Sequence, residues 1–538
     1  MPEQAGQTKK RERRLSKQPA FSLILIRLSI FLSENEKVLS DLVLHIFSNP
    51  DKIDKIERHI YLKHIKKEKP MKKTHAASSA ATENGKGEKR SMLEGSPGIG
   101  LFLFALPMIL GNLFQQFYNM TDSIIVGRFV GEDALAAVGA SYSLTNVFVM
   151  IAIGGGIGAS VITSQYLGAG RFDRMKTSVY TALITFLGVG IFLGAFGFVM
   201  NRQILIWLNT PENILDAAGT YLGIYFLGMP FLFMYNILSS MFNALGDSRT
   251  PLGLLIFSSV LNVVLDLWFV LSFGLAVAGV AIATVMAQGL AAILSFLLLM
   301  RRLKGFEAEG RIAKYDTGIL ASMVRIAIPS ILQQSIVSIG MLLVQSVVNG
   351  FGSSVLAGYS AGTRIESICI VPMISTGNAV STFTAQNMGA RKPERVKAGY
   401  RAAWGIVAGF GVVILLILSL FGRAVIGAFL DTGGTGEAFE TGYAYLSFLK
   451  FFFVCIGLKA ITDGVLRGAG DVVVFTCANL VNLTIRVAGA FLLAPVIGVA
   501  AVWYAVPAGW TVNFLISFVR YLTGKWSRRD LVREEPAP

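Results

Sequence analysis

Histidine is almost missing from this chain of 538 residues, and the few that exist lie together at one end. The four are His45, His59, His64 and His75, all before residue 98. The remainder of the chain therefore has no imidazole, and any proton exchange there must use carboxyl groups. The three cysteines fall in apolar segments at unrelated spacings, which argues against a disulfide or a metal site.

Charge is also scarce. Only 15% of the residues are charged, 53% are hydrophobic, and the mean hydropathy is +0.60. A soluble protein of this size needs more charge, so the composition indicates a polytopic membrane protein. The net charge of +15 does not indicate nucleic acid, because many basic residues lie in short loops between apolar runs. With no catalytic triad signature either, we expect a protein that is not an enzyme.

An internal repeat dominates what is present. The stretch Leu106–Gln165 recurs as Ala327–Gln386, with Pro107 answering to Pro329. The two copies continue without a gap into the segments QYLGAGR and QNMGARK. Both copies are apolar, so the chain contains a duplicated membrane unit. Many secondary transporters use such a unit to build a site that opens to either side of the membrane.

The apolar runs predict about twelve transmembrane helices in an all-α fold. They cover residues 99–126, 134–167, 177–200, 213–243, 251–273, 279–300, 319–349, 355–387, 398–421, 438–468, 473–493 and 498–521. Basic residues favour the loops on one side of the membrane, which predicts both termini in the cytoplasm. Because each repeat has an even number of helices, six, both halves insert into the membrane with the same orientation. We therefore expect two lobes around a central cleft, related by a pseudo-two-fold axis along the membrane normal.

The predicted organisation has four parts. Helices 1–6 form an N-lobe over residues 98–310, helices 7–12 form a C-lobe over 311–525, and residues 526–538 form a cytoplasmic tail. Residues 1–97 form a basic extension with a linker-like composition, which we expect to be disordered. Two interpretations of this extension stay open: a cytoplasmic arm that touches anionic lipid, or a mis-assigned start with translation beginning at Met71 or Met92.

Several segments resemble multidrug and toxic compound extrusion (MATE) transporters. Pro107–Arg128 is similar to the first helix of that family, and Leu261–Gln288 to the fifth and sixth helices. The QYLGAGR and QNMGARK segments resemble the loops that close helices two and eight, and Thr363–Ser367 (TRIES) resembles the bacterial DinF-like and MepA-like members. The resemblance covers residues 99–525. It implies export of bulky, mostly cationic drugs in exchange for entering protons or sodium ions.

Two acidic residues stand out inside predicted helices. Asp122 shares one helical face with Gln115 and Tyr118, and an ionised carboxylate in hydrocarbon is costly, so it should face a polar interior. A simple helix–helix hydrogen-bond cluster is the alternative. Asn262 and Asp266 lie one turn apart on the fifth predicted span.

Thr284 lies on the sixth predicted span, after a short turn. The oxygen donors of Asn262, Asp266 and Thr284 suit a hard cation or a protonated carboxyl group, so proton and sodium are not distinguished.

The resemblance assigns these groups to the N-lobe cation site of the family. The coupling residues it implies are Asp122, Asn262, Asp266 and Thr284, which are also the ligands of a sodium ion if one binds. The residues it places along the lobe are Gln115, Tyr118, Tyr221 and Asn236. No cofactor is expected beyond the coupling ion.

The second repeat does not reproduce this site. Asn482 is kept, but Arg486 stands near the position equivalent to Asp266, and Val344 is level with Asp122. Coupling is therefore expected in the N-lobe only. For Arg364 and Glu366, both in the eighth predicted span, two interpretations stay open: Glu366 binds the cationic substrate or protons, as the resemblance permits, or an interhelical ion pair holds the bundle.

These observations predict a secondary active multidrug efflux antiporter in the bacterial cytoplasmic membrane. Its partners are cationic drugs, a coupling ion and the lipid bilayer, with no nucleic acid, and we expect a monomer. The alternative is a flippase for lipid-linked precursors. That function predicts a strongly cationic central cavity and often additional helices, whereas this N-lobe carries acids.

Overall fold

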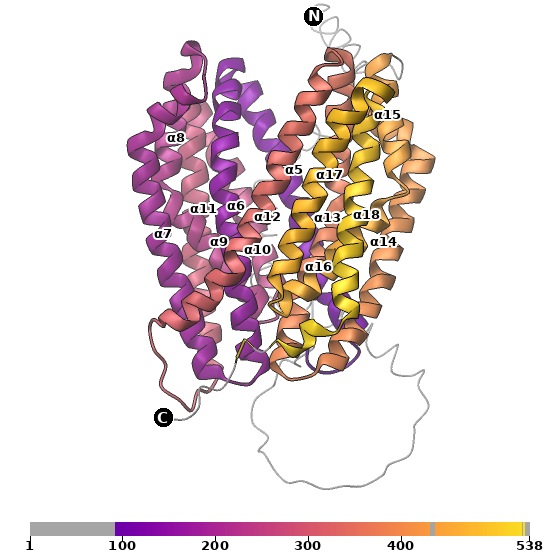
Figure 1. Ribbon diagram of the computed structural model, residues 1–538. Coiled ribbons are helices and arrows are strands. Elements are labelled where there is room, and N and C mark those ends of the chain that lie inside the picture. The colour runs from indigo at the N-terminus through magenta and orange to yellow at the C-terminus, as the bar shows by residue number, and fades with distance from the viewer. Residues whose placement is uncertain (1–91, 431–435, 530, 533–538) are drawn as a thin grey trace, which may run out of the picture. The chain divides into compact units, whose positions relative to one another are not determined.

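The computed structural model describes residues 92–430, 436–529 and 531–532, and over these residues every regular element is a helix (Figure 1). This follows from the sequence because a backbone in hydrocarbon has no water to bond to. A helix satisfies its N–H and C=O groups within one segment. The all-α prediction is confirmed.

The elements of each half are as follows. The first half comprises α5 (Pro97–Ile125), the π-helix η1 (Val126–Val130), α6 (Glu132–Gly168), α7 (Phe172–Trp207), α8 (Glu212–Leu227), α9 (Met229–Ala244), α10 (Arg249–Phe273) and α11 (Ala276–Lys304). The second half comprises α12 (Thr317–Asn349), α13 (Ser353–Gly389), α14 (Pro393–Gly427), α15 (Glu437–Leu449), α16 (Phe453–Gly468), α17 (Val472–Ile497), α18 (Ala500–Leu522) and the 3-10 turn η2 (Lys525–Arg528). Among the described residues, 10 helices are long and apolar enough to span a membrane, or up to 12 if each of two bent pairs is one span.

The two bent pairs correct the sequence prediction. Residues 213–243 were expected as one helix, but α8 and α9 meet at a bend of 52°. Gly228 stands at the break and Pro230 opens α9, so a helix end and a helix start follow each other. Residues 438–468 likewise divide into α15 and α16, bent by 55°. Hydropathy does not detect such breaks because both parts are apolar.

The first helix of each repeat packs against the other half. Helix α5 lies against α13 and α14, whereas α12 lies against α6. Glycines make the second contact possible: a Cβ on Gly154 would collide with Ile331, and one on Gly158 with the backbone of Met323 and Ala327. The glycine cluster at 154–158 thus permits close approach of the two helices.

The two halves also meet at the ends of α6 and α13, through equivalent residues of the repeat. Gln165 Nε2 donates to the carbonyl of Gly468 at 2.9 Å, and Gln386 Nε2 donates to the carbonyl of Ala244 at 2.9 Å. Each glutamine therefore bonds the backbone of the opposite half. We call this region, from residues 165–171 and 386–392, the junction.

Short segments outside the spans are attached to the bundle. Asn387 donates to the carbonyl of Met92 at 2.9 Å, which fixes the start of α5 on the second half. Trp526, in the predicted tail, is buried and stacks on Tyr521 with ring centroids 5.6 Å apart. Of the predicted N-terminal extension, residues 1–91 lie outside the described residues.

Candidate ion-coupling site

Two carboxyl groups face each other between α5 and α10. Asp122 is half-buried and Asp266 is fully buried. Their side chains lie within hydrogen-bonding reach of each other, and one oxygen of each, Oδ1, is buried without a donor. The sequence placed both acids in one lobe, and the structure brings them into direct contact.

Three polar side chains surround the acid pair. Tyr118, one turn before Asp122 on α5, is hydrogen-bonded through its hydroxyl group to the side-chain amide of Asn262. The Asn262 amide group also lies 3.1 Å from Asp266 Oδ2 and 3.4 Å from Thr284 Oγ1 on α11. Residues from α5, α10 and α11 thus form one hydrogen-bonded cluster.

An aromatic wall closes one side of this cluster. Tyr221 and Tyr225 of α8 stack with ring centroids 6.2 Å apart, and both lie near Tyr118. Tyr221 also lies near the two acids, and its role in lining the lobe stays a prediction. Sequence reasoning missed Tyr225, although its position one turn after Tyr221 places the two on one helical face.

The helix that carries Asp122 changes geometry just beyond the site. Residues 126–130 form the π-helix η1, which continues α5. Single π-helical turns are rare and often lie at functional sites. Here the wider turn directly follows the acid that would bind the ion.

The cluster has a definite chemical capacity. Two ionised carboxylates in contact repel strongly in an interior of low dielectric constant, so the pair needs a shared proton or a cation. The oxygens of Asp122, Asp266, Asn262 and Thr284 are hard donors of the kind that a sodium ion accepts. Both ions fit this set.

Two predicted lining residues do not join the cluster. Gln115 donates to Asn119 at 2.9 Å along its own helix, and Asn236 donates to the carbonyl of Leu232 at 2.9 Å. Each side-chain amide therefore forms its hydrogen bond within its own helix. The structure shows no contact between either amide and the acid pair.

A polar stripe on α5 was not predicted. Asn112, Gln116, Asn119 and Ser123 recur on one helical face and are all exposed. Exposed polar groups within a membrane span face a water-filled space rather than lipid. The equivalent positions of the second repeat on α12 are also polar: Gln334, Ser338 and Gln345 correspond to 112, 116 and 123. In the sequence, an alignment of the two repeats would have revealed the polar residues at equivalent positions.

The second half holds a different buried charge cluster. Glu366 on α13 is buried, accepts a hydrogen bond from Tyr445 at 2.5 Å, and interacts electrostatically with Arg486 on α17. Arg364 on the same helix is exposed, and the basic residue that faces Glu366 from another helix is Arg486. Two positions apart on a helix, the side chains of Arg364 and Glu366 point in different directions.

Arg486 stands where the first repeat has Asp266, as the sequence indicated. It is 7% exposed, and its Nε has no hydrogen-bond partner in the described structure. Val344, level with Asp122, is buried in an apolar cluster. The two halves therefore share a fold but carry opposite charge at this position.

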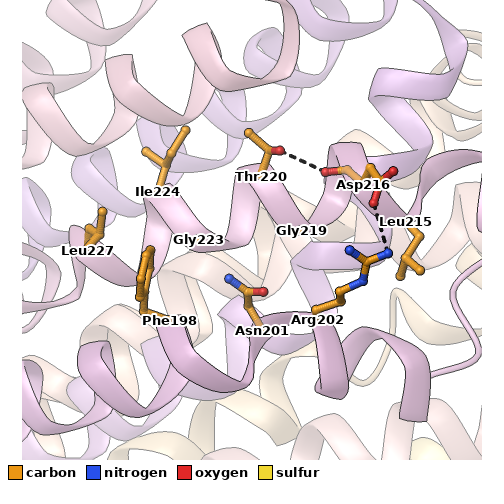
Figure 2. A pocket seen from close by; sticks show the side chains of 10 residues that line it. All are labelled: Phe198, Asn201, Arg202, Leu215, Asp216, Gly219, Thr220, Gly223, Ile224 and Leu227. Carbon is orange, nitrogen blue, oxygen red and sulfur yellow. Dashed lines mark hydrogen bonds and ion pairs between the residues drawn. The ribbon is translucent and has the colours of Figure 1, made fainter.

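A surface groove lies apart from both charge clusters. Figure 2 shows it between α7 and α8, where Asn201, Arg202, Asp216 and Thr220 line it. Its volume is about 470 Å³. The ion pair between Arg202 and Asp216 spans 3.5 Å and both side chains are largely exposed. The groove includes none of the predicted coupling residues.

Comparisons with known proteins agree with this arrangement. The family model MatE matches residues 107–268 and 329–492, one match in each repeat. The "Probable multidrug resistance protein YpnP" of Bacillus subtilis is 30% identical over 437 residues, covering 81% of this chain and 97% of that protein. A "FAD transporter" of Shewanella oneidensis is 23% identical over 69% of this chain and 80% of its own length.

Solved structures match the fold as well. One described as an outward-facing conformation of a multidrug resistance MATE family transporter superposes with a TM-score of 0.76 at 21% identity. The match covers 83% of this chain and 100% of that chain. The helices are thus arranged alike despite the low identity.

Proposed function

The chain belongs to the MatE family of multidrug efflux transporters, and we propose that it exports bulky organic cations in exchange for entering protons or sodium ions. The observation that carries this proposal is the contact between Asp122 and Asp266. A pair of facing carboxyl groups changes its charge when it gains or loses one cation. That property is what coupling to an ion gradient requires.

Helix α5 is suited to transmit such a change. Its start is held by the second half, where Arg395 donates to the carbonyls of Glu94 and Gly95, each at 2.8 Å. Its later part carries Asp122 into the first half. Pro107 lies between the two attachments and has no N–H for the helix, which makes bending easier there.

The proposed cycle follows from these attachments. An ion from outside enters the acid pair and removes the repulsion between Asp122 and Asp266. The side chains repack, α5 bends near Pro107, and the polar stripe releases the bound cation outward. The halves then rock, and the ion leaves to the cytoplasm. Each inward charge gains about 2.3 kcal/mol per 100 mV of membrane potential, enough to drive efflux.

Transport by the purified protein in proteoliposomes tests both parts of the proposal. Ethidium efflux is measured under a proton gradient and, separately, under a sodium gradient. At least one gradient should drive efflux by the parent, and Asp122→Asn and Asp266→Asn should each abolish the response. Asp216→Asn is the matched control because its side chain is exposed, at 88%. Normal gradient-driven efflux by both acid variants would disprove the coupling role.

The substrate class needs its own comparison, because one relative is named a FAD transporter and FAD is an anion. Ethidium and FAD are therefore offered to the same proteoliposomes. We expect ethidium to be exported and FAD not. Export of FAD alone would reject cationic substrates but leave the coupling role intact. Translocation of a fluorescent lipid in place of either compound would favour the flippase alternative.

We also propose that the protein works as a monomer in a bacterial cytoplasmic membrane with both termini inside. Basic residues support this orientation, since Arg171, Arg301 and Arg391 lie at the end of the bundle that also holds the tail. Protease cleavage of a C-terminal tag in inverted vesicles, but not in intact cells, would support it. Cleavage in intact cells would refute it.

A further inference from the structure

A second pocket lies at the junction, where both halves meet the C-terminal tail. Its volume is about 710 Å³, within the range of small-molecule sites. Residues after α6, residues after α13 and residues from η2 onward line it, and they include Arg171, Arg391, Arg528 and Arg529. None of its described lining residues is acidic. The pocket therefore concentrates positive charge.

Among the described residues, most of this charge has no carboxylate beside it. Arg529 forms an ion pair with Asp471 at 3.3 Å. Arg171, Arg391 and Arg528 have no carboxylate partner among the described residues. Guanidinium groups gathered without counter-charges repel one another, and an anion between them removes that repulsion.

The backbone at Arg391 is a second, independent observation. Arg391 has φ of 56°, in the left-handed region that favours glycine. The first repeat has Gly170 at the equivalent position, with φ of 73°. This conformation is strained for a residue with a Cβ and unstrained for glycine. The second repeat therefore places an arginine at a backbone position where the first repeat has glycine.

Two long helices also begin at the pocket. The N-cap of α7 is Arg171 and the N-cap of α14 is Lys392, and neither helix has a side-chain cap. Free N–H groups and the helix dipole make such ends attractive to anions. The first-turn acids do not line the pocket: Glu394 pairs with Lys397 at 2.9 Å, and Asp173 lies against Gly310.

We propose that this pocket binds a phosphate-bearing anion with at least two negative charges, bridging Arg171 of the first half and Arg391 of the second. Guanidinium groups match phosphate oxygens in geometry and charge. Because the ligand contacts both halves, it favours the conformation in which the junction is closed. Transport needs this end to open, so the ligand restrains the cycle. The site is separate from the acid pair and independent of the transported compound.

Binding of inorganic pyrophosphate to the full chain in detergent tests the site. Isothermal titration at fixed ionic strength should show saturable binding by the parent. Arg171→Gln/Arg391→Gln should weaken it about tenfold or more, through lost charge-assisted hydrogen bonds. Arg301→Gln/Arg311→Gln removes the same charge from exposed positions and should stay within about twofold. No saturable binding by the parent, or equal losses in both double variants, would overturn the proposal.

Hydrogen exchange of the parent gives a test that needs no variant. Pyrophosphate should slow amide exchange in residues 165–171 and 386–392 together, because the ligand joins the two segments. Slowing in only one segment, or in neither, would reject bridging.

Two lipid environments then distinguish a soluble ligand from a lipid headgroup. If anionic headgroups occupy the same pocket, pyrophosphate affinity will fall in nanodiscs that contain phosphatidylglycerol, relative to phosphatidylcholine alone. Unchanged affinity in the two kinds of nanodisc supports a soluble phosphate compound as the occupant.

Discussion

Gly168 of α6 lies directly against the backbone carbonyl of Gln386 in α13, so closely that no methyl group fits between them. Gly389 makes the same contact with Gln165, its counterpart in the other half. The two halves therefore touch backbone to backbone at the junction. This contact is symmetric within the repeat and depends on the absence of two side chains.

Alanine at either glycine should force the junction apart. We expect Gly168→Ala and Gly389→Ala each to cost about 1–3 kcal/mol, the usual range for overpacking, and to lower efflux because this end cannot close. Thermal unfolding in detergent and ethidium efflux measure the two effects. Gly253→Ala on α10 is the control, since a Cβ there meets open space. Equal behaviour of all three variants would contradict the close contact.

Removal of one hydroxyl group tests the polar cluster around the acids. Tyr118→Phe loses the hydrogen bond to Asn262 but keeps the ring against α8. A net hydrogen bond contributes about 0.5–1.5 kcal/mol, so we expect the ion concentration for half-maximal efflux to change by several-fold while the protein stays folded. Tyr142→Phe, at an exposed position, should change nothing. An unchanged ion response in Tyr118→Phe would remove Tyr118 from the site.

The buried charges of the second half should stabilise each other rather than bind an ion. We expect Glu366→Gln and Arg486→Gln each to lower the midpoint of thermal unfolding, and the double variant to lose less than the sum. A coupling of about 0.5–3 kcal/mol is typical of neighbouring charged groups. Strictly additive losses would show that Glu366 and Arg486 act separately.

Replacement of Asp471 should destabilise the fold more than replacement of most other acidic residues. It is fully buried and pairs with Arg520 at 2.6 Å as well as with Arg529. Asp471→Asn leaves a partly buried guanidinium group without its carboxylate, and we expect a loss of about 3–5 kcal/mol.

The exposed pair of Arg423 and Glu440, at 2.5 Å, is the comparison for Asp471. Glu440→Gln should cost less than about 1 kcal/mol, because solvent screens surface pairs. Thermal unfolding of both variants in one detergent measures the difference. Similar midpoints would contradict the role assigned to Asp471.

The sequence was most informative where one residue type has one physical consequence. Long apolar runs predicted the span of α10 to within a few residues, because hydrocarbon imposes a minimum helix length. The cost of a charge in that environment singled out Asp122, and the family resemblance placed it in one site with Asp266. The alignment of the two repeats then placed Arg486 at the position equivalent to Asp266, with the opposite charge.

Other features could not be predicted from the sequence, because they depend on the distances between helices. The bend at Gly228 had a local signal in Pro230, but the break between α15 and α16 has neither glycine nor proline between Leu449 and Phe453. The partner of Glu366 was also not predictable, because Arg486 lies on a helix far away in the sequence. Side chains from separate helices find partners through packing, which hydropathy and spacing do not describe.

The packing of each first helix against the other half bears on how the duplicated chain evolved. Each α6-type helix packs against its own repeat and also against the first helix of the other, since α12 contacts α6 and α5 contacts α13. An ancestor with a single repeat would have completed this packing only as a pair of copies, in which each copy packed its first helix against the other. Fusion of the two genes would then have made the arrangement permanent. Each half expressed alone should accordingly accumulate only when the other is supplied beside it.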